Sequence, residues 1–382
     1  MASSNHALVI GASGLIGWAV VEQLLQHPAF GHVTALVNRP LSIQDSFWPS
    51  HATGYPTLSL VSGVNLLCSD AEFLSLLQEK VTNGDTISHV FYFAFKEDPN
   101  DETEARLNVS MMRRVVRGVN SISSKLQAFV YPGGTRGYGI YLPGGIFSAP
   151  LSEEMADNLP ESYKKTVAYP YYRALLTEES QNSSWTWCEL CPDAIIGFTP
   201  NGSGFSLAGH WAVYLYAYKL VYGEGANVPF PGVAAGYDSL YTETSAKTLA
   251  KVAIFASLHP EDFRERIFNV ADNAQPGSMR ERWPQIASWF GLKGVPPPEN
   301  ASASDMKPSE FIKQHREKLD AQGVKGVEIW NSKQLDSYGY WLTFDRHLCL
   351  DRLRAAGFHE ESRPEEGWWE TFEMFKKAGM IR

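Results

Sequence analysis

Two tyrosines in the chain are followed, four residues later, by a basic side chain. Tyr92 precedes Lys96, and Tyr169 precedes Arg173. A tyrosine hydroxyl can donate a hydrogen bond to a substrate oxygen on which negative charge develops, and a nearby cation favours its ionised form. On a helix, residues four apart share a face, whereas on a strand they lie about 13 Å apart. Tyr92 lies in an apolar run typical of a strand, so only Tyr169 and Arg173 have workable spacing.

Glycines near the N-terminus have the spacing of a phosphate-binding turn. They follow the apolar run at 8–10 directly and precede an apolar stripe with helical spacing. Glycine permits a tight turn, close approach of the backbone to a diphosphate, and close packing of the next helix on the sheet. The first amides of that helix present the positive end of its dipole. We therefore predict a dinucleotide-binding turn built from Gly11, Ser13, Gly14, Leu15, Ile16 and Gly17.

The residues after the second expected strand, at 33–37, indicate which dinucleotide binds. In dinucleotide-binding folds an acidic residue here holds the ribose hydroxyls of NAD, whereas an arginine accommodates the 2′-phosphate of NADP. This chain has no acid at the position and carries Asn38 and Arg39 instead. We therefore predict NADP(H) as the cofactor, the alternative being that Arg39 is simply a solvated loop residue.

Strands and helices are expected to alternate over about the first half of the chain. The expected strands are 8–10, 33–37, 58–61, 89–95, 128–131 and 185–190, with a shorter one at 266–270; the expected helices begin near Leu15 and cover 70–79 and 102–120, with another opening at Tyr169. This alternation predicts an α/β fold with a doubly wound parallel sheet, the Rossmann arrangement. We expect an NADP-binding domain over 1–198, with returning elements around 236–272, and a smaller, mainly helical substrate-binding lobe over 199–382.

Ligands of such sheets bind at the carboxyl ends of the strands. Asn65 lies after the third strand, where adenine usually rests, and the end of the fourth strand faces the nicotinamide. Asn108 lies on the following helix. The further residues expected to contact the cofactor are Ala94, Phe95, Pro192 and Ile195.

Composition narrows the class of partner. A net charge of -9 argues against nucleic acid. The N-terminus has no basic segment and the chain has no 18-residue apolar run, so we predict a cytoplasmic protein that does not bind a membrane. Cys188 and Cys191 form a CxxC without a second pair, so we predict reduced thiols and no metal site. The 13% of aromatic residues suits either a pocket for a large apolar ligand or additional core packing.

Several blocks in order carry a resemblance to one family. They are Gly-Ala-Ser-Gly-Leu-Ile-Gly at 11–17, Asn38-Arg39-Pro40, Phe91-Tyr-Phe-Ala-Phe95, Asn108, Gly134-Thr-Arg-Gly-Tyr138, Tyr171-Tyr172, Phe198-Thr-Pro, Phe230-Pro-Gly and Phe268-Asn-Val. Over roughly three quarters of its length the chain resembles the extended short-chain dehydrogenases, and among them the progesterone 5β-reductase and iridoid synthase-like group.

The resemblance implies NADPH-dependent reduction of an enone or a ketone. Its first tyrosine of the Tyr-Tyr pair, here Tyr171, would donate a hydrogen bond to the substrate oxygen. That group takes its catalytic lysine from the loop after the fifth strand, where this chain has Arg136. Arginine supplies charge but cannot lose its proton, which leaves hydride transfer intact and puts proton relay in question. Tyr169 and Tyr172 remain alternatives for the key tyrosine.

The resemblance also implies the substrate-facing residues. Phe95 stands where the group has tryptophan, which would leave more room over the substrate, and the helix at 207–222 would cover it. A helical aromatic stripe is also typical of a core, and Tyr138 fits pocket or packing equally. The expected substrate contacts are Phe95, Tyr138, Tyr172, Phe198, His210, Trp211 and Tyr214.

Three functions are consistent with these residues. The first is an NADPH-dependent reductase of an enone or ketone in a bulky apolar molecule of secondary metabolism. The second is a non-redox cyclase or isomerase on the same scaffold, and the third is a catalytically silent NADP-binding sensor. The expected partner is the apolar substrate, with a homodimer left open.

Overall fold

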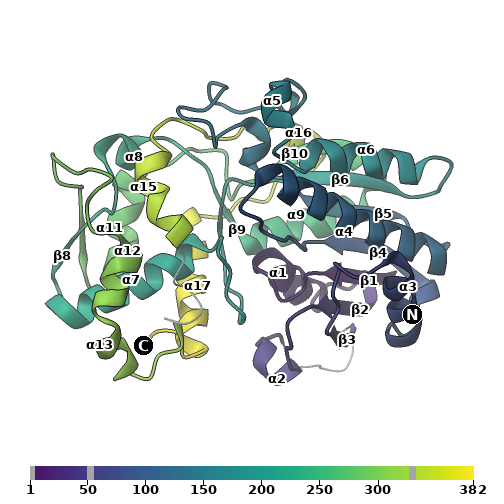
Figure 1. The fold of residues 1–382 in the computed structure, drawn as a ribbon, viewed down its shortest axis with the longest axis horizontal. Coiled ribbons are helices and arrows are strands. Elements are labelled where there is room, and N and C mark those ends of the chain that lie inside the picture. The colour runs from purple at the N-terminus through teal and green to yellow at the C-terminus, as the bar shows by residue number, and fades with distance from the viewer. Residues whose placement is uncertain (1–4, 50–55, 327–332) are drawn as a thin grey trace.

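A seven-stranded parallel sheet forms the centre of the computed structural model, which describes residues 5–49, 56–326 and 333–382 (Figure 1). The strand order is β10-β6-β5-β4-β1-β2-β3, so the chain reverses direction across the sheet between β1 and β4. The strands are β1 (Asn5–Ile10), β2 (Phe30–Val37), β3 (Thr57–Ser62), β4 (Ile87–Tyr92), β5 (Ala128–Pro132), β6 (Thr186–Cys191) and β10 (Arg266–Asn269). The predicted α/β fold with a parallel sheet is confirmed.

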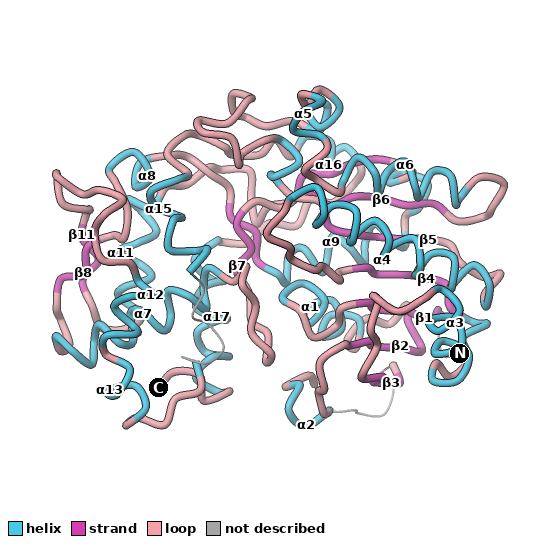
Figure 2. The backbone as a smooth tube through the Cα atoms, in the orientation of Figure 1, coloured by secondary structure: helices cyan, strands magenta, loops and turns pink. Residues whose placement is uncertain are grey.

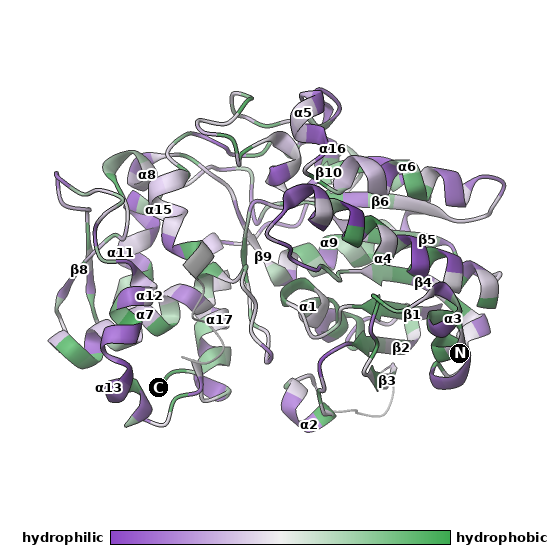
Figure 3. Cartoon of the chain, viewed as in Figure 1, coloured by the Kyte–Doolittle hydropathy of each residue, from purple (hydrophilic) through white to green (hydrophobic). Residues whose placement is uncertain are grey.

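Helices cover both faces of the sheet, which is why its central strands are apolar on both sides. In Figure 3, β4 and β5 are largely green, and purple residues lie mostly on the surrounding helices and loops. One face carries α1 (Leu15–Leu24) and α9 (Ala246–Leu258), with α10 (Pro260–Phe263) beside α9; the other carries α3 (Asp70–Lys80), α4 (Asp101–Ile122) and α6 (Tyr169–Ser180). Side-chain caps fix several helix starts: Asn100 accepts from Thr103 N at 2.9 Å, and Ser69 with Glu72 forms a capping box on α3.

A mainly helical part lies beside the sheet, and Figure 2 shows the loops and β7 that join the two. It contains α7 (Leu207–Tyr222), α8 (Ala234–Asp238), α11 (Met279–Trp289), α12 (Pro308–Gln314), α13 (Arg316–Asp320), α15 (Tyr338–Trp341) and α17 (Pro364–Lys377). The remaining elements are the helices α2 (Ile43–Ser46), α5 (Glu161–Lys164) and α16 (Asp351–Ala355), the paired strands β7 (Ala194–Ile196) with β9 (Glu243–Ser245) and β8 (Asn227–Pro229) with β11 (Lys293–Val295), and 3₁₀ turns at Gly84–Thr86, Thr135–Tyr138, Glu153–Asp157 and Lys333–Ser337. No helix within the described ranges is long and apolar enough to cross a membrane.

Two local predictions were wrong. The strand expected at 89–95 ends at Tyr92, because its neighbour β1 ends at Ile10 and offers no further partner; Phe93 N makes the last bond, to Ile10 O at 2.8 Å. The second concerns Val-Pro-Phe-Pro-Gly at 228–232, whose prolines and glycine predict a loop: its first residues belong to β8, which pairs with β11, a strand 66 positions later in the chain. A strand whose partner is this distant leaves no local signal in the sequence.

Buried histidines occupy the amino ends of the strands, away from the edge where ligands bind. His6 contacts Thr86 Oγ1 at 2.9 Å and Thr34 Oγ1 at 2.8 Å through its two ring nitrogens, and His89 is equally buried on β4. Burial lowers the pKa of each histidine to about 4, with repulsion from His32 adding to the effect on His6. Both are therefore neutral in the native protein at neutral pH.

Acidification should consequently weaken the fold. Between the unfolded pKa of 6.5 and the native value of about 4 the unfolded state binds more protons, so stability falls as pH falls through this window. We expect His6→Asn to flatten the dependence of the free energy of unfolding on pH by about 1.4 kcal/mol per pH unit. Urea titrations of variant and wild type across pH 4.5 to 6.5 measure this difference. Burial raises the pKa of Asp272 to about 6, so this residue makes stability change with pH in the opposite direction. Asp272 is present in both proteins, so its contribution cancels from their difference.

Candidate active site

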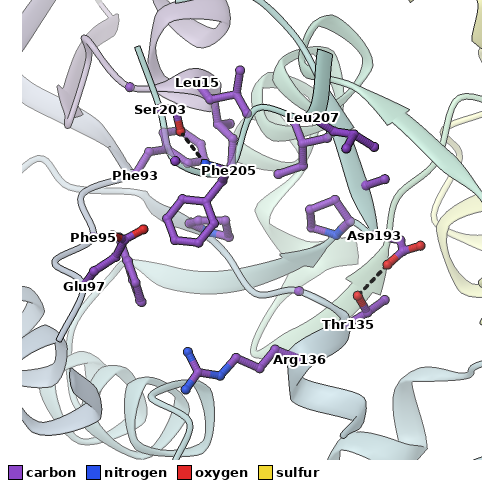
Figure 4. A pocket seen from close by; sticks show the side chains of 18 of the residues that line it. Leu15, Phe93, Phe95, Glu97, Thr135, Arg136, Asp193, Ser203, Phe205 and Leu207 are labelled. Carbon is purple, nitrogen blue, oxygen red and sulfur yellow. Dashed lines mark hydrogen bonds between the residues drawn. The ribbon is translucent and has the colours of Figure 1, made fainter. Parts of the chain in front are cut away.

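A cavity of about 1020 Å³ opens at the carboxyl edge of the sheet, between the sheet and the helical part (Figure 4). It lies at the point where the strand order reverses, which is where ligands bind in open α/β sheets. Its walls come from the loops that follow the strands and from two segments of the helical part. The loops contribute residues 14–16 after β1, Arg39 after β2, 92–97 at the end of β4, 132–136 after β5 and 192–195 after β6. The two segments of the helical part are 201–207, before α7, and residues between 335 and 342.

The glycine turn after β1 has the backbone that a diphosphate requires. Gly11 has a φ of +77°, and a Cβ there would lie 2.8 Å from Ala94 N and from the carbonyl of Phe93. A Cβ on Gly17 would lie 2.9 Å from Gly11 C, so α1 packs directly on the turn. Gly14 differs, because its Cβ would meet only Gly11 O, at 3.2 Å, and the residue lines the cavity. The backbone at Gly14 is thus open to a ligand, which fits a dinucleotide diphosphate.

Helix α6 presents Tyr169 to the cavity, not Tyr171. The Tyr169 ring packs beside the loop after β5, with its hydroxyl oxygen 3.3 Å from the position of a Cβ on Gly134. Tyr171 is 41% exposed and is absent from the described residues that line the cavity. Two residues along a helix correspond to a rotation of about 200°, so the two side chains lie on opposite faces. The structure thus places Tyr171 outside the cavity and the two alternatives, Tyr169 and Tyr172, at its wall; of these, Tyr169 is the one beside the loop after β5.

Arg136 is the cation near Tyr169. It lies in the 3₁₀ turn after β5, forms an ion pair with Glu104 and a second with Asp101 at 3.0 Å, and donates to Thr166 O at 2.8 Å. Burial lowers the pKa of Arg136, but the hydrogen bond and charge of Glu104 outweigh burial and raise it above its usual value. Burial raises the pKa of Tyr169, and the positive charge of Arg136 opposes that rise. At neutral pH, Tyr169 is thus a protonated donor beside a permanent cation.

Arg173, four residues after Tyr169, serves another partner. Its Nη1 donates to Glu189 Oε2 at 2.9 Å, and that carboxylate is buried behind the loop after β5, where it also accepts from Tyr131 Oη at 2.8 Å. Arg173 does not line the cavity as far as the described residues show. Tyr169 and Arg173 are therefore four residues apart on one helix, but Arg173 is held in an ion pair with Glu189 beneath the sheet edge.

Arg39 lines the cavity at the end of β2 and ties it to the segment before α7. Its Nη1 donates to Asn201 O at 2.8 Å and its Nη2 to Gly202 O at 3.3 Å. The same segment is fixed to the glycine turn, since Thr199 Oγ1 donates to Ser13 O at 2.6 Å. Arg39 thus occupies the position predicted for recognition of a 2′-phosphate while it also holds the segment that covers the turn.

The other predicted cofactor contacts divide into two groups. Leu15, Ile16, Ala94, Phe95, Pro192 and Ile195 line the cavity. Asn38, Asn65 and Asn108 are not among the described lining residues. Asn38 and Asn65 are exposed, whereas Asn108 is fully buried and holds the backbone of Lys96, with Oδ1 accepting from its N at 2.9 Å and Nδ2 donating to its O at 2.8 Å. Asn108 therefore positions the loop after β4 instead of contacting the cavity.

Most of the predicted substrate contacts are packing residues. Tyr138 is buried and donates to Asn269 Oδ1 at 2.6 Å; Phe198 packs on Trp18 with ring centroids 5.0 Å apart. On α7, Trp211 lies among other aromatic rings of the core, including Trp283. Within the described part of the chain the cavity wall lacks Tyr138, Phe198, His210, Trp211 and Tyr214, whereas Phe95 and Tyr172 belong to it. The covering role predicted for α7 was wrong because the helix is apolar around its circumference and buries this stripe in the core.

Several residues of the cavity wall were not predicted from the sequence. Phe205 follows the glycine-rich stretch Asn-Gly-Ser-Gly at 201–204, a turn signal that could have placed it at a loop before the α7 cap, Ser206. Tyr141 likewise precedes a turn signal, Pro-Gly-Gly at 143–145, whereas Trp341 has none beside it. Trp341 lies 200 positions after Tyr141 in the chain, and only the tertiary fold brings both to the cavity.

Comparisons with known proteins agree with this architecture. The family described as PRISE-like Rossmann-fold domain matches residues 7–381. The short chain dehydrogenase ausT of Aspergillus calidoustus is 29% identical, over 99% of this chain and 95% of its own. The 3-oxo-Delta(4,5)-steroid 5-beta-reductase of Arabidopsis thaliana is 24% identical, over 97% and 92%. Among solved structures, Gre2 from Candida albicans superposes with a TM-score of 0.62 at 13% identity, over 98% and 99% of the two chains, which shows a shared fold.

Proposed function

The chain belongs to the family of PRISE-like Rossmann-fold domains, and from this premise we propose that it is an NADPH-dependent reductase. Its substrate is an enone or a ketone in a bulky apolar small molecule. One observation carries the proposal: Tyr169 and Arg136 both line the cavity that the glycine turn also lines, and they are close enough for the charge of Arg136 to act on the pKa of Tyr169. The names of the matched relatives, short chain dehydrogenases and a steroid reductase among them, support the reductase or dehydrogenase class.

The residues of the cavity fit a dinucleotide. Gly14 and the start of α1 would hold the diphosphate, and Arg39 would meet the 2′-phosphate. Pro192 and Ile195, which follow β6, would flank the nicotinamide. When bound, NADPH supplies the hydride for the reduction.

Tyr169 would bind and polarise the substrate oxygen. A hydroxyl whose pKa is raised by burial stays protonated and can donate a hydrogen bond to a carbonyl or enone oxygen. As that oxygen gains negative charge, the bond strengthens, which is the form of electrostatic stabilisation that lowers a barrier. Arg136 adds a positive charge that cannot dissociate, so it stabilises the developing anion without exchanging a proton.

The test is the loss of NADPH absorbance with a panel of bulky apolar enones and ketones, with products identified by mass spectrometry. We expect stoichiometric oxidation of NADPH and a product two hydrogens heavier. Product formation without NADPH loss would overturn the proposal in favour of a cyclase or isomerase. Tight NADPH binding without turnover of any compound would favour a sensor.

Arg39→Leu should weaken NADPH binding selectively. A charge-assisted contact to the 2′-phosphate would be lost, which corresponds to an increase in Kd of about 10-fold or more. Binding of NADH, which lacks this phosphate, should change by less than about threefold, because Arg39 would have no group to contact there. Titrations of both cofactors by nicotinamide fluorescence measure the ratio. If the Kd values of NADPH and NADH rose equally, Arg39 would act only by holding the segment before α7.

A further inference from the structure

We propose that the substrate is uncharged and carries flat conjugated rings. Four aromatic side chains at the cavity bind these rings by stacking against them. This inference rests on the proposed function, since it names the substrate class of the same site. The four side chains, called the aromatic collar here, are Phe95, Tyr141, Phe205 and Trp341.

The collar stands out because large aromatic side chains are normally more buried than these. Phe95, Tyr141 and Phe205 are 41 to 42% exposed and Trp341 is 46% exposed, yet all four line the cavity. Exposed apolar surface gathered at one concave place is typical of a ligand-binding site. A substrate entering the cavity would remove this surface from water.

The collar draws on both sides of the cavity: Phe95 and Tyr141 come from loops after strands of the sheet, and Phe205 and Trp341 from the helical part. Phe95 and Phe205 lie next to each other in Figure 4, and their rings meet edge to face with centroids 5.8 Å apart. Trp341 Nε1 donates to Ile140 O at 3.3 Å, next to Tyr141. Two aromatic rings in stacked or edge-to-face contact gain interaction energy beyond that of the area they bury, and a saturated ring lacks the π system needed for this gain. The collar therefore selects for flat conjugated rings and not only for bulk.

The charged side chains that are less exposed at the cavity, Arg136 and Asp193, already have oppositely charged partners. Arg136 pairs with Glu104 and Asp101. Asp193 pairs with the buried Arg346 at 3.0 Å and accepts from Thr135 Oγ1 at 2.7 Å. Lys96 and Glu97 also line the cavity, but both are exposed to water. Beside the two pairs, a charged substrate group would leave water without gaining a new partner, which is costly. The inner cavity therefore favours a neutral molecule.

The test compares ligands of nearly equal size and identical oxygen chemistry. Chalcone (diphenylpropenone), dicyclohexylpropenone and chalcone carboxylate are titrated by calorimetry into the full chain saturated with NADP⁺, so that no reduction occurs. Dicyclohexylpropenone is the more hydrophobic of the neutral pair, so burial of area alone would favour it. We expect chalcone to bind about tenfold more tightly than dicyclohexylpropenone, and the carboxylate more weakly than chalcone.

Variants identify the collar as the source of that preference. Phe205→Leu and Trp341→Ala should reduce the preference for chalcone to within about threefold. Trp369→Ala is the matched control, because Trp369 is 36% exposed and is not among the described residues lining the cavity; it should keep the preference. Equal binding of the two neutral enones, or equal effects of the Trp341 and Trp369 variants, would overturn the inference. Selective binding of chalcone with no NADPH oxidation would instead count against the proposed function.

Discussion

Replacing Tyr169 with phenylalanine is expected to lower kcat by about 100-fold or more. The substitution removes only the hydroxyl that would donate to the substrate oxygen, and general acid assistance of this kind contributes about that much. Because the ring remains, KM for the substrate should change little. Steady-state measurements of NADPH oxidation with wild type and variant give both constants.

Tyr171→Phe is the matched control, since it removes the same atom from the same helix two positions away. Tyr171 is exposed outside the cavity, so its kcat should stay within about threefold of wild type. The reverse result would be a large loss of kcat in the Tyr171 variant and none in the Tyr169 variant. It would show that Tyr171, and not Tyr169, is the residue of α6 that faces the substrate. A large loss in neither variant would rule out hydrogen-bond catalysis by Tyr169 and by Tyr171, and would leave Tyr172 as the tyrosine of this helix that lines the cavity.

Replacing Arg136 with methionine is expected to affect both stability and turnover. Glu104, only 7% exposed, would lose its cation, and breaking a buried pair by removing one partner costs about 3 to 5 kcal/mol. The cavity would also lose the positive charge near Tyr169, which should lower kcat about 10-fold or more. Urea unfolding and NADPH oxidation measure the two effects separately.

Two further variants separate the roles of Arg136. Combining Arg136→Met with Glu104→Gln removes both charges, so most of the lost stability should return while kcat stays low. Arg136→Lys keeps the charge and should retain more activity than the methionine variant. If the double variant regained wild-type kcat, Arg136 would act only through the fold and not on the reacting oxygen.

Local signals explain why much of the fold could be predicted. The apolar run before Gly11 and the glycines at fixed spacing specify a strand, a turn and a helix through neighbouring residues alone. The start of α6 at Tyr169, with proline next, and the bounds of α7 follow equally from nearby residues. Arg39 could likewise be located at the end of β2 before the sheet was known.

The face that a helix or segment turns to the cavity could not be predicted in this way. Tyr169 and Tyr171 are equivalent in the local sequence, and only the packing of α6 on the sheet decides that the first lies beside Arg136. Glu189, on a strand that pairs between β5 and β10, draws Arg173 away from the helix face where its spacing would place it.

The alternation of strands and helices that indicates a Rossmann fold, the glycine turn and the place of Arg39 at the end of β2 could be predicted without the structure, because each leaves a pattern among neighbouring residues. Which tyrosine lies near Arg136 and which aromatic residues form the wall depend instead on how distant segments pack. Trp211 and Trp341 show why: both are aromatic and lie in helices, yet packing from distant segments buries the first in the core and leaves the second at the cavity. Such contacts join residues that are far apart in the chain, so no local pattern records them.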